Sequence, residues 1–186
     1  MSEVKRVFTV DGKPFFSVGG QARNSSGYNE LESETAFKAV KLVHGNTLEI
    51  PVYWEQIEAE EGKFDFASVD NLLASARRYE LKLVLLWFAT WKNGCMEYSP
   101  QWVKSDAKRF PRVKSTTGDD VWVLSSHYQA TLDADRRAFC ALCEYLKQND
   151  HDPQSVIAIQ IENEPGILGS DRDYGDLAQE EFEGIP

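Results

Sequence analysis

Two glutamates, an asparagine and a proline follow one apolar segment of the chain directly. The segment reads IQIENEPG over residues 159–166, and its apolar part has the length and composition of a buried β-strand. A carboxylate at the end of a buried strand costs free energy unless it has a hydrogen-bonding or charged partner. A carboxylate kept there without such a partner is a candidate for a functional role. Because carboxyl groups donate and accept protons, Glu162 and Glu164 are candidates for acid/base chemistry, with Asn163 as a hydrogen-bonding neighbour.

The strand period and the proline make two predictions about this segment. Side chains alternate across a strand, so the three isoleucines at 157, 159 and 161 should face the helices, while Glu162 and Glu164 share the opposite face. Pro165 has no N–H and restricts the residue before it, so we expect Glu164 to be extended and held rigidly at the strand tip. Asn163 reaches the same pocket only if the strand end twists or bulges.

The elements that must position these residues alternate between strands and helices. Asp11-Gly12 predicts a hairpin whose second arm, ending at Gly19-Gly20, is the first strand. A helix follows over 33–45, with Ser33 as its cap and Gly45 as its stop. The pattern then predicts strands at 46–52, 81–88 and 155–161 and helices at 65–81 and 133–148.

This alternation predicts an α/β fold with a parallel sheet covered by helices. Periodicity alone leaves open whether the sheet is doubly wound or part of a (β/α)8 barrel. No glycine-rich phosphate-binding loop follows a strand, which removes the most recognisable nucleotide-binding sheets. Residues 89–130 form the longest irregular region, and loops of that length are usually functional or disordered.

Composition narrows the function classes. The 186 residues are 42% hydrophobic and carry a formal charge of -10, which suits one globular domain and repels nucleic acid and anionic membranes. The first residues lack the apolar run of a signal peptide, and three cysteines cannot all pair, so we expect a cytoplasmic protein. Cys140 and Cys143 are interpreted as small residues on a helix face rather than a zinc or redox site.

Two segments carry a resemblance to a known group of enzymes. Asn163-Glu164-Pro165 after the fourth strand resembles the acid/base signature of the retaining (β/α)8 glycoside hydrolases. The segment YWEQIEAEEGKFDFASVDNLL, residues 53–73, is similar to the W-x-x-x-E-P-x-x-G-x-F-D-F segment of families 35 and 42, the β-galactosidases. The similarity extends from about residue 8 to 170 and implies a partial TIM (β/α)8 barrel, strands one to four with their helices, preceded by a β-hairpin arm.

The resemblance implies roles for two residues and no metal or cofactor. Glu164 would be the general acid that protonates the glycosidic oxygen and then the base that activates water. Asn163 would bind the sugar's 2-hydroxyl. A proton donor at neutral pH needs a pKa raised to about 6–7, and burial beside other acids acts in that direction. Glu162 could add to that effect or bind a sugar hydroxyl.

Other candidate sugar contacts are weaker. Trp54 and Trp91 lie at or just after the ends of strands two and three, where rings could stack on a sugar; core packing is an equal alternative for each. Asn24, after strand one, could bind hydroxyls or serve in a turn. The carboxylates Glu49, Glu55, Glu97 and Asp106 are interpreted as surface or sugar-contact residues, because nothing in their spacing favours one as a nucleophile.

The sequence also departs from the family pattern. Glu58-Ala59 replaces Glu-Pro, and the family 35 His-Tyr pair after strand one has no counterpart, which puts galactose specificity in question. In the clan that the chain resembles, the nucleophile comes from strand seven, and a complete barrel needs about 250 residues. We therefore expect residues 1–186 to be the truncated N-terminal half of a catalytic barrel, inactive alone and prone to self-association through its exposed edges.

Three other interpretations stay open at this point. The chain could be a non-catalytic carbohydrate-binding or assembly module derived from such a barrel. It could be an unrelated α/β barrel enzyme that uses Glu164 as a proton-abstracting base. Finally, Glu-Asn-Glu-Pro could be a solvated acidic turn without a function.

Overall fold

The central element is a four-stranded parallel sheet. The computed structural model describes residues 7–151 and 153–184. Its strands β3 (Gly19–Gln21), β4 (Thr47–Tyr53), β5 (Lys82–Lys92) and β8 (Val156–Asn163) lie side by side in that order. Each strand is parallel to its neighbour. Strand order that follows chain order is the arrangement of consecutive units in a (β/α)8 barrel, so the barrel alternative is confirmed over the doubly wound one.

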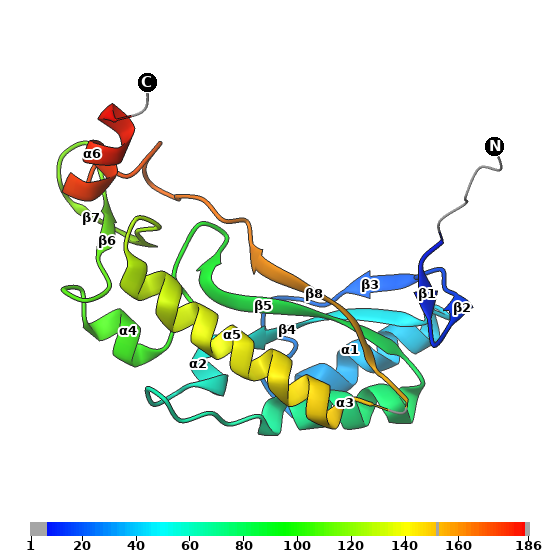
Figure 1. Ribbon diagram of the computed structural model, residues 1–186. Helices are drawn as coiled ribbons and strands as arrows, with labels where there is room; N and C mark the ends of the chain where they lie inside the picture. Colours follow the sequence, from blue (N-terminus) through cyan, green and yellow to red (C-terminus); the bar gives the residue numbers. More distant parts are fainter. Residues whose placement is uncertain (1–6, 152, 185–186) are drawn as a thin grey trace, which may run out of the picture.

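Three long helices cover one face of this sheet (Figure 1). They are α1 (Glu30–Leu42), α3 (Ala67–Tyr79) and α5 (Gln129–Asn149). Their apolar stripes pack with alternate strand residues into the main core, which includes Leu48 and Ile50 of β4 and Leu83, Leu85 and Trp87 of β5. Ile159 packs partly against the same core, as the strand alternation predicts.

The starts of two elements differ from the predictions. Helix α1 begins after Asn29, whose side chain accepts the Glu32 N–H at 3.0 Å, so Ser33 lies inside the helix rather than at its cap. The predicted hairpin is a separate two-stranded sheet of β1 (Thr9–Val10) and β2 (Lys13–Pro14). The first barrel-type strand therefore starts later, at Gly19.

The long connection after β5 is ordered by short elements. They are α4 (Gln101–Ser105), β6 (Arg112–Lys114) and β7 (Asp120–Leu124), with β6 and β7 antiparallel. Two further short helices are α2 (Trp54–Ile57) and α6 (Asp176–Glu183). In Figure 1, β6, β7 and α6 lie together beyond the carboxyl end of the sheet.

The sheet face opposite the helices carries a second, smaller cluster. Tyr53, Leu86 and Phe88 are buried there, with Tyr98 packed against them. Strands β3 and β8 are the edges of the sheet.

Within the described ranges, no helix is long and apolar enough to span a membrane. Cys95, Cys140 and Cys143 are free thiols, and the last two lie on α5.

Candidate active site

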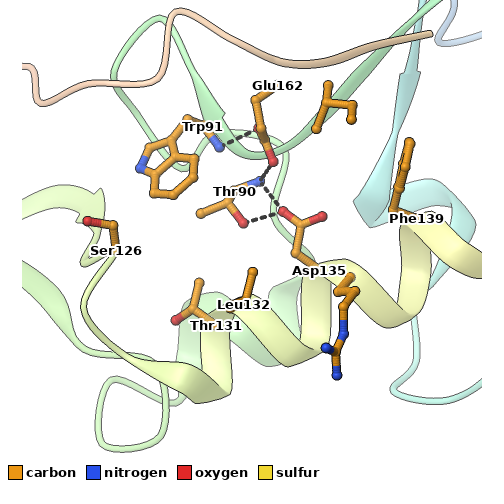
Figure 2. Close-up of a pocket in the computed structure, with 10 residues that line it drawn as sticks. Thr90, Trp91, Ser126, Thr131, Leu132, Asp135, Phe139 and Glu162 are labelled. Atoms are coloured by element: carbon orange, nitrogen blue, oxygen red, sulfur yellow. Dashed lines mark hydrogen bonds between the residues drawn. The ribbon is translucent and has the colours of Figure 1, made fainter.

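The tip of β8 does not continue the strand geometry. Glu162 has φ +60° and Glu164 has φ +52°, both in the left-handed region that side chains other than glycine rarely adopt. The expectation of an extended Glu164 is therefore wrong, although Pro165 follows it. The strand alternation also ends here, since Glu162 turns toward α5 instead of sharing a face with Glu164 (Figure 2).

The turn after β5 holds the tip of β8 from the other side. Asn93 and Gly94 both have positive φ, and Lys92 pairs with Cys95 across them, as in a two-residue hairpin. The Asn93 N–H donates to the Asn163 carbonyl and the Gly94 N–H to the Glu164 carbonyl, each at 3.1 Å. These two bonds set the backbone positions of both residues.

Glu164 is exposed, which contradicts the expectation of a buried carboxyl. The physical reason is its place directly after β8, an edge strand that has β5 on one side only. The residues that follow Glu164, Pro165 and Gly166, line a cavity of about 380 Å³ together with Trp91 and His127. The cavity therefore begins at the residue that follows Glu164.

Lys92 is the functional candidate that the sequence interpretation missed. It is 6% exposed, its ammonium lies 4.7 Å from the Phe88 ring centroid, and it donates to the Asn93 side-chain oxygen. None of the ion pairs in the described part of the chain involves Lys92. Burial lowers the pKa of Lys92, and the charge of Glu164 opposes that shift. The Asn93-Gly94 turn signal could have identified this position.

Asn163 lies in a polar network beside Lys92. Its side-chain oxygen accepts from Gln160 Nε2 at 3.1 Å, and its amide nitrogen lies 3.4 Å from the Asn93 oxygen that also accepts from Lys92. The structure therefore brings Asn163, Glu164 and Lys92 together at the carboxyl end of the sheet, the end at which barrel enzymes keep their chemistry.

Aromatic rings line the neighbouring part of this face. The Tyr53 ring lies 5.0 Å from the Tyr28 and Tyr98 rings and 6.0 Å from that of Phe88, measured between centroids. The Tyr53 hydroxyl donates to the Asn24 carbonyl at 2.6 Å, so Asn24 contributes its backbone to this cluster while the residue is exposed. Burial and the neighbouring Glu55 raise the pKa of Tyr28 to about 12.

The other predicted contacts occupy different positions. Trp54 is fully buried in the main core, where its Nε1 donates to Glu58 at 2.8 Å, so its ring is not open to a sugar. Trp91 is half-buried and lines two cavities. Glu162 is 8% exposed, and its two oxygens accept the N–H groups of Thr90 and Trp91 rather than facing a sugar hydroxyl.

Two of the four carboxylates that the sequence offers as possible nucleophiles already have hydrogen-bond partners. Glu55 accepts from the Tyr28 hydroxyl at 2.8 Å and from Lys104 at 3.2 Å. Asp106 accepts the Arg109 N–H at 3.0 Å. Both side chains therefore have hydrogen-bond partners within the chain.

Comparison with known proteins identifies the family. The sequence model of glycoside hydrolase family 42, which is described as β-galactosidase, matches residues 27–185. A β-galactosidase of Xanthomonas manihotis is 26% identical over 171 residues, which are 90% of this chain and 26% of that protein.

Two solved β-galactosidase structures have the same fold in the matched region. Gan42B, a family 42 enzyme of G. stearothermophilus, matches with a TM-score of 0.66 and 20% identity over 88% of this chain and 23% of its own. The Bacillus circulans sp. alkalophilus enzyme matches with a TM-score of 0.62 and 18% identity over 86% of this chain and 22% of its own. The chain thus spans about a quarter of the length of these relatives. Because the family match covers most of its residues, the chain belongs to glycoside hydrolase family 42.

Proposed function

We propose that this chain supplies the acid/base part of a retaining β-glycosidase that acts on β-galactosides or related β-glycosides. Glu164 is the general acid and then the general base, and Asn163 binds the 2-hydroxyl of the sugar. The observation that carries the proposal is the place of Asn163 and Glu164, at the carboxyl end of the fourth parallel strand in a family 42 chain.

The nucleophile belongs outside these 186 residues in this proposal. A retaining glycosidase needs a second carboxyl about 5–5.5 Å from the first. The charge that influences Lys92 at the tip of β8 is that of Glu164 itself. Glu55 accepts a hydrogen bond from Lys104, and Asp106 accepts one from Arg109. Residues 1–186 are then part of a larger catalytic barrel and inactive alone. The sugar's leaving group would lie in the cavity beside Pro165, where Trp91 offers a ring for stacking.

A panel of aryl β-glycosides tests this proposal on the protein expressed from its complete coding sequence. We expect turnover of the β-galactoside with retention of configuration at the anomeric carbon, which NMR of the first product detects. An inverted product would contradict the retaining mechanism. Activity toward carbonyl substrates alone would support the proton-abstracting alternative.

A non-catalytic sugar-binding module is the second candidate. The exposure of Glu164 favours it, because general acids that work at neutral pH are usually buried carboxyl groups. This candidate predicts calorimetric binding of galactose without turnover of any glycoside in the panel.

Self-association and location complete the proposal. Strands β3 and β8 are sheet edges, and Ile161 on β8 is 65% exposed, so we expect the isolated chain to sediment as a species larger than a monomer.

The three free thiols support a reducing, cytoplasmic location, which fractionation of the source cells would test.

Replacing Lys92 with Met should shift the alkaline limb of the kcat/KM profile to higher pH. The charge of Glu164 acts on Lys92, and such an interaction is mutual, so removal of the cation should move the limb by up to about one pH unit. The pH dependence of aryl β-glycoside hydrolysis measures the shift. Lys63→Met, at an exposed pair with Glu60, is the control and should leave the profile in place. A shift to lower pH in Lys92→Met would contradict the assignment.

A further inference from the structure

Two carboxyl groups that the proposed mechanism does not use meet between α5 and the tips of β5 and β8. Glu162 accepts the Thr90 N–H at 3.0 Å and the Trp91 N–H at 2.8 Å. Asp135 of α5 accepts the same Thr90 N–H at 3.3 Å, the Thr90 hydroxyl, and Trp87 Nε1 at 2.9 Å. Figure 2 shows both carboxyl groups pointing toward Thr90 at one side of a cavity of about 290 Å³.

The two carboxyl groups accept from the same N–H group of Thr90. Carboxylates that approach a single N–H group repel each other, so ionisation of one disfavours ionisation of the other. Burial raises the pKa of Glu162 well above its usual range, and the contact with Asp135 raises it further. A protonated Glu162 can donate its hydroxyl hydrogen to Asp135, which removes the repulsion between two carboxylates. Arg136 of α5 is the other charged residue that lines the cavity, and Lys92 and Glu164 are the charged residues nearest along β5 and β8.

The pair fixes an unusual backbone. The register of β5 and β8 shifts between Trp87 and Lys92, and Glu162 and Glu164 have positive φ. Such conformations cost about 1–3 kcal/mol each and persist only where the surroundings determine them. The side chain of Glu162 is bonded to β5 and lies beside α5, so the chain must turn at this residue. That turn directs the next two residues, Asn163 and Glu164, to the carboxyl end of the sheet.

We propose that Asp135 and Glu162 form a proton-sharing positioning pair that holds Asn163 and Glu164 in their working geometry. The inference rests on the proposed function for its effect on catalysis. Neither member needs to touch the substrate, since Glu162 is 8% exposed and bonded to backbone at both oxygens. Asp135 acts through Thr90 and Glu162, and both are positioning residues.

Substitutions at the two positions separate this role from general packing. In Glu162→Gln the amide oxygen accepts from Trp91, the amide nitrogen donates to Asp135, and the Thr90 N–H keeps Asp135 as its acceptor, so kcat should stay within about threefold of wild type. Glu162→Ala and Asp135→Ala lose the connection, and kcat should fall about 10²-fold with KM changed less than about threefold, as a small misplacement of a catalytic group does. Asp133→Ala, on the same helix at an exposed pair with Arg136, is the matched control and should behave as wild type.

Amide hydrogen exchange supplies a measurement that does not depend on turnover. The Asn93 and Gly94 N–H groups donate to the Asn163 and Glu164 carbonyls, so they report the position of the β8 tip. In the protein expressed from its complete coding sequence, their exchange should be about tenfold faster in Glu162→Ala and Asp135→Ala and unchanged in Glu162→Gln. If Glu162→Ala does not fold, Asp135→Ala, at a partly exposed residue, decides the question.

The outcomes distinguish this inference from the proposed function. If the wild-type protein hydrolyses no glycoside, the proposed function fails, and the exchange rates alone test the positioning pair. Wild-type exchange and kcat in Glu162→Ala and Asp135→Ala would overturn the pair. Equal losses in Glu162→Gln and Glu162→Ala would overturn the shared proton as the connection.

Discussion

Glu164→Gln should lower kcat for glycosides with poor leaving groups by about 10²–10⁴-fold, the range that general acid catalysis contributes. Gln has nearly the same shape but cannot donate a proton to the glycosidic oxygen. An activated leaving group, such as a dinitrophenolate, departs without protonation, so cleavage of its glycosides should fall much less. The measurement is the ratio of the two rates on the protein expressed from its complete coding sequence.

Two comparisons make this result specific to Glu164. Glu144→Gln makes the same chemical change at an exposed carboxyl on α5 and should leave both rates unchanged. External azide should restore part of the rate of Glu164→Gln on the activated substrate, because a small anion needs no general base to attack the intermediate. Equal losses on both substrates would argue that Glu164 is not the general acid.

The sheet and its helices were predictable because they follow from local patterns. The apolar segments at 81–88 and 155–161 became β5 and β8, and the stripes between the strands became the covering helices. Strand order was the one feature that periodicity left open. The likeness of residues 53–73 to the family 35 and 42 segment favoured the barrel order, and the structure has it.

The geometry of the β8 tip was not predictable, because its causes are distant in sequence. Strand alternation and Pro165 both favour an extended chain. Glu162 instead turns so that its carboxyl group accepts from the N–H groups of Thr90 and Trp91, which lie about 70 residues earlier in the sequence. Asp135 carries no sequence signal at all, since it is one polar residue among several on α5. The position of Trp54 was undecided between sugar stacking and core packing, and its bond to Glu58 explains why it lies in the core.

Glu58→Ala should lower the free energy of unfolding by about 3 kcal/mol, near the lower end of the cost of breaking a buried ion pair. Glu58 is fully buried and accepts from Trp54 Nε1 at 2.8 Å, from the Gly62 N–H at 2.7 Å and from Arg137 at 2.8 Å. Removing the carboxylate leaves three donors without their acceptor. Arg137 is 39% exposed, so water can solvate it in part and moderate the loss.

Glu58, the glutamate at the Glu-Pro position of the YWEQIEAEEGKFDF segment, therefore has a structural role. Glu58 connects α2 and the following turn to α5, the helix that also carries Asp135. Denaturant unfolding followed by tryptophan fluorescence measures the effect. Glu60→Ala, at an exposed pair with Lys63, is the control and should change stability by less than about 1 kcal/mol, because solvent screens exposed pairs. Equal stabilities for Glu58→Ala and Glu60→Ala would show that water replaces the lost carboxylate, and the segment would then need another explanation for its acid.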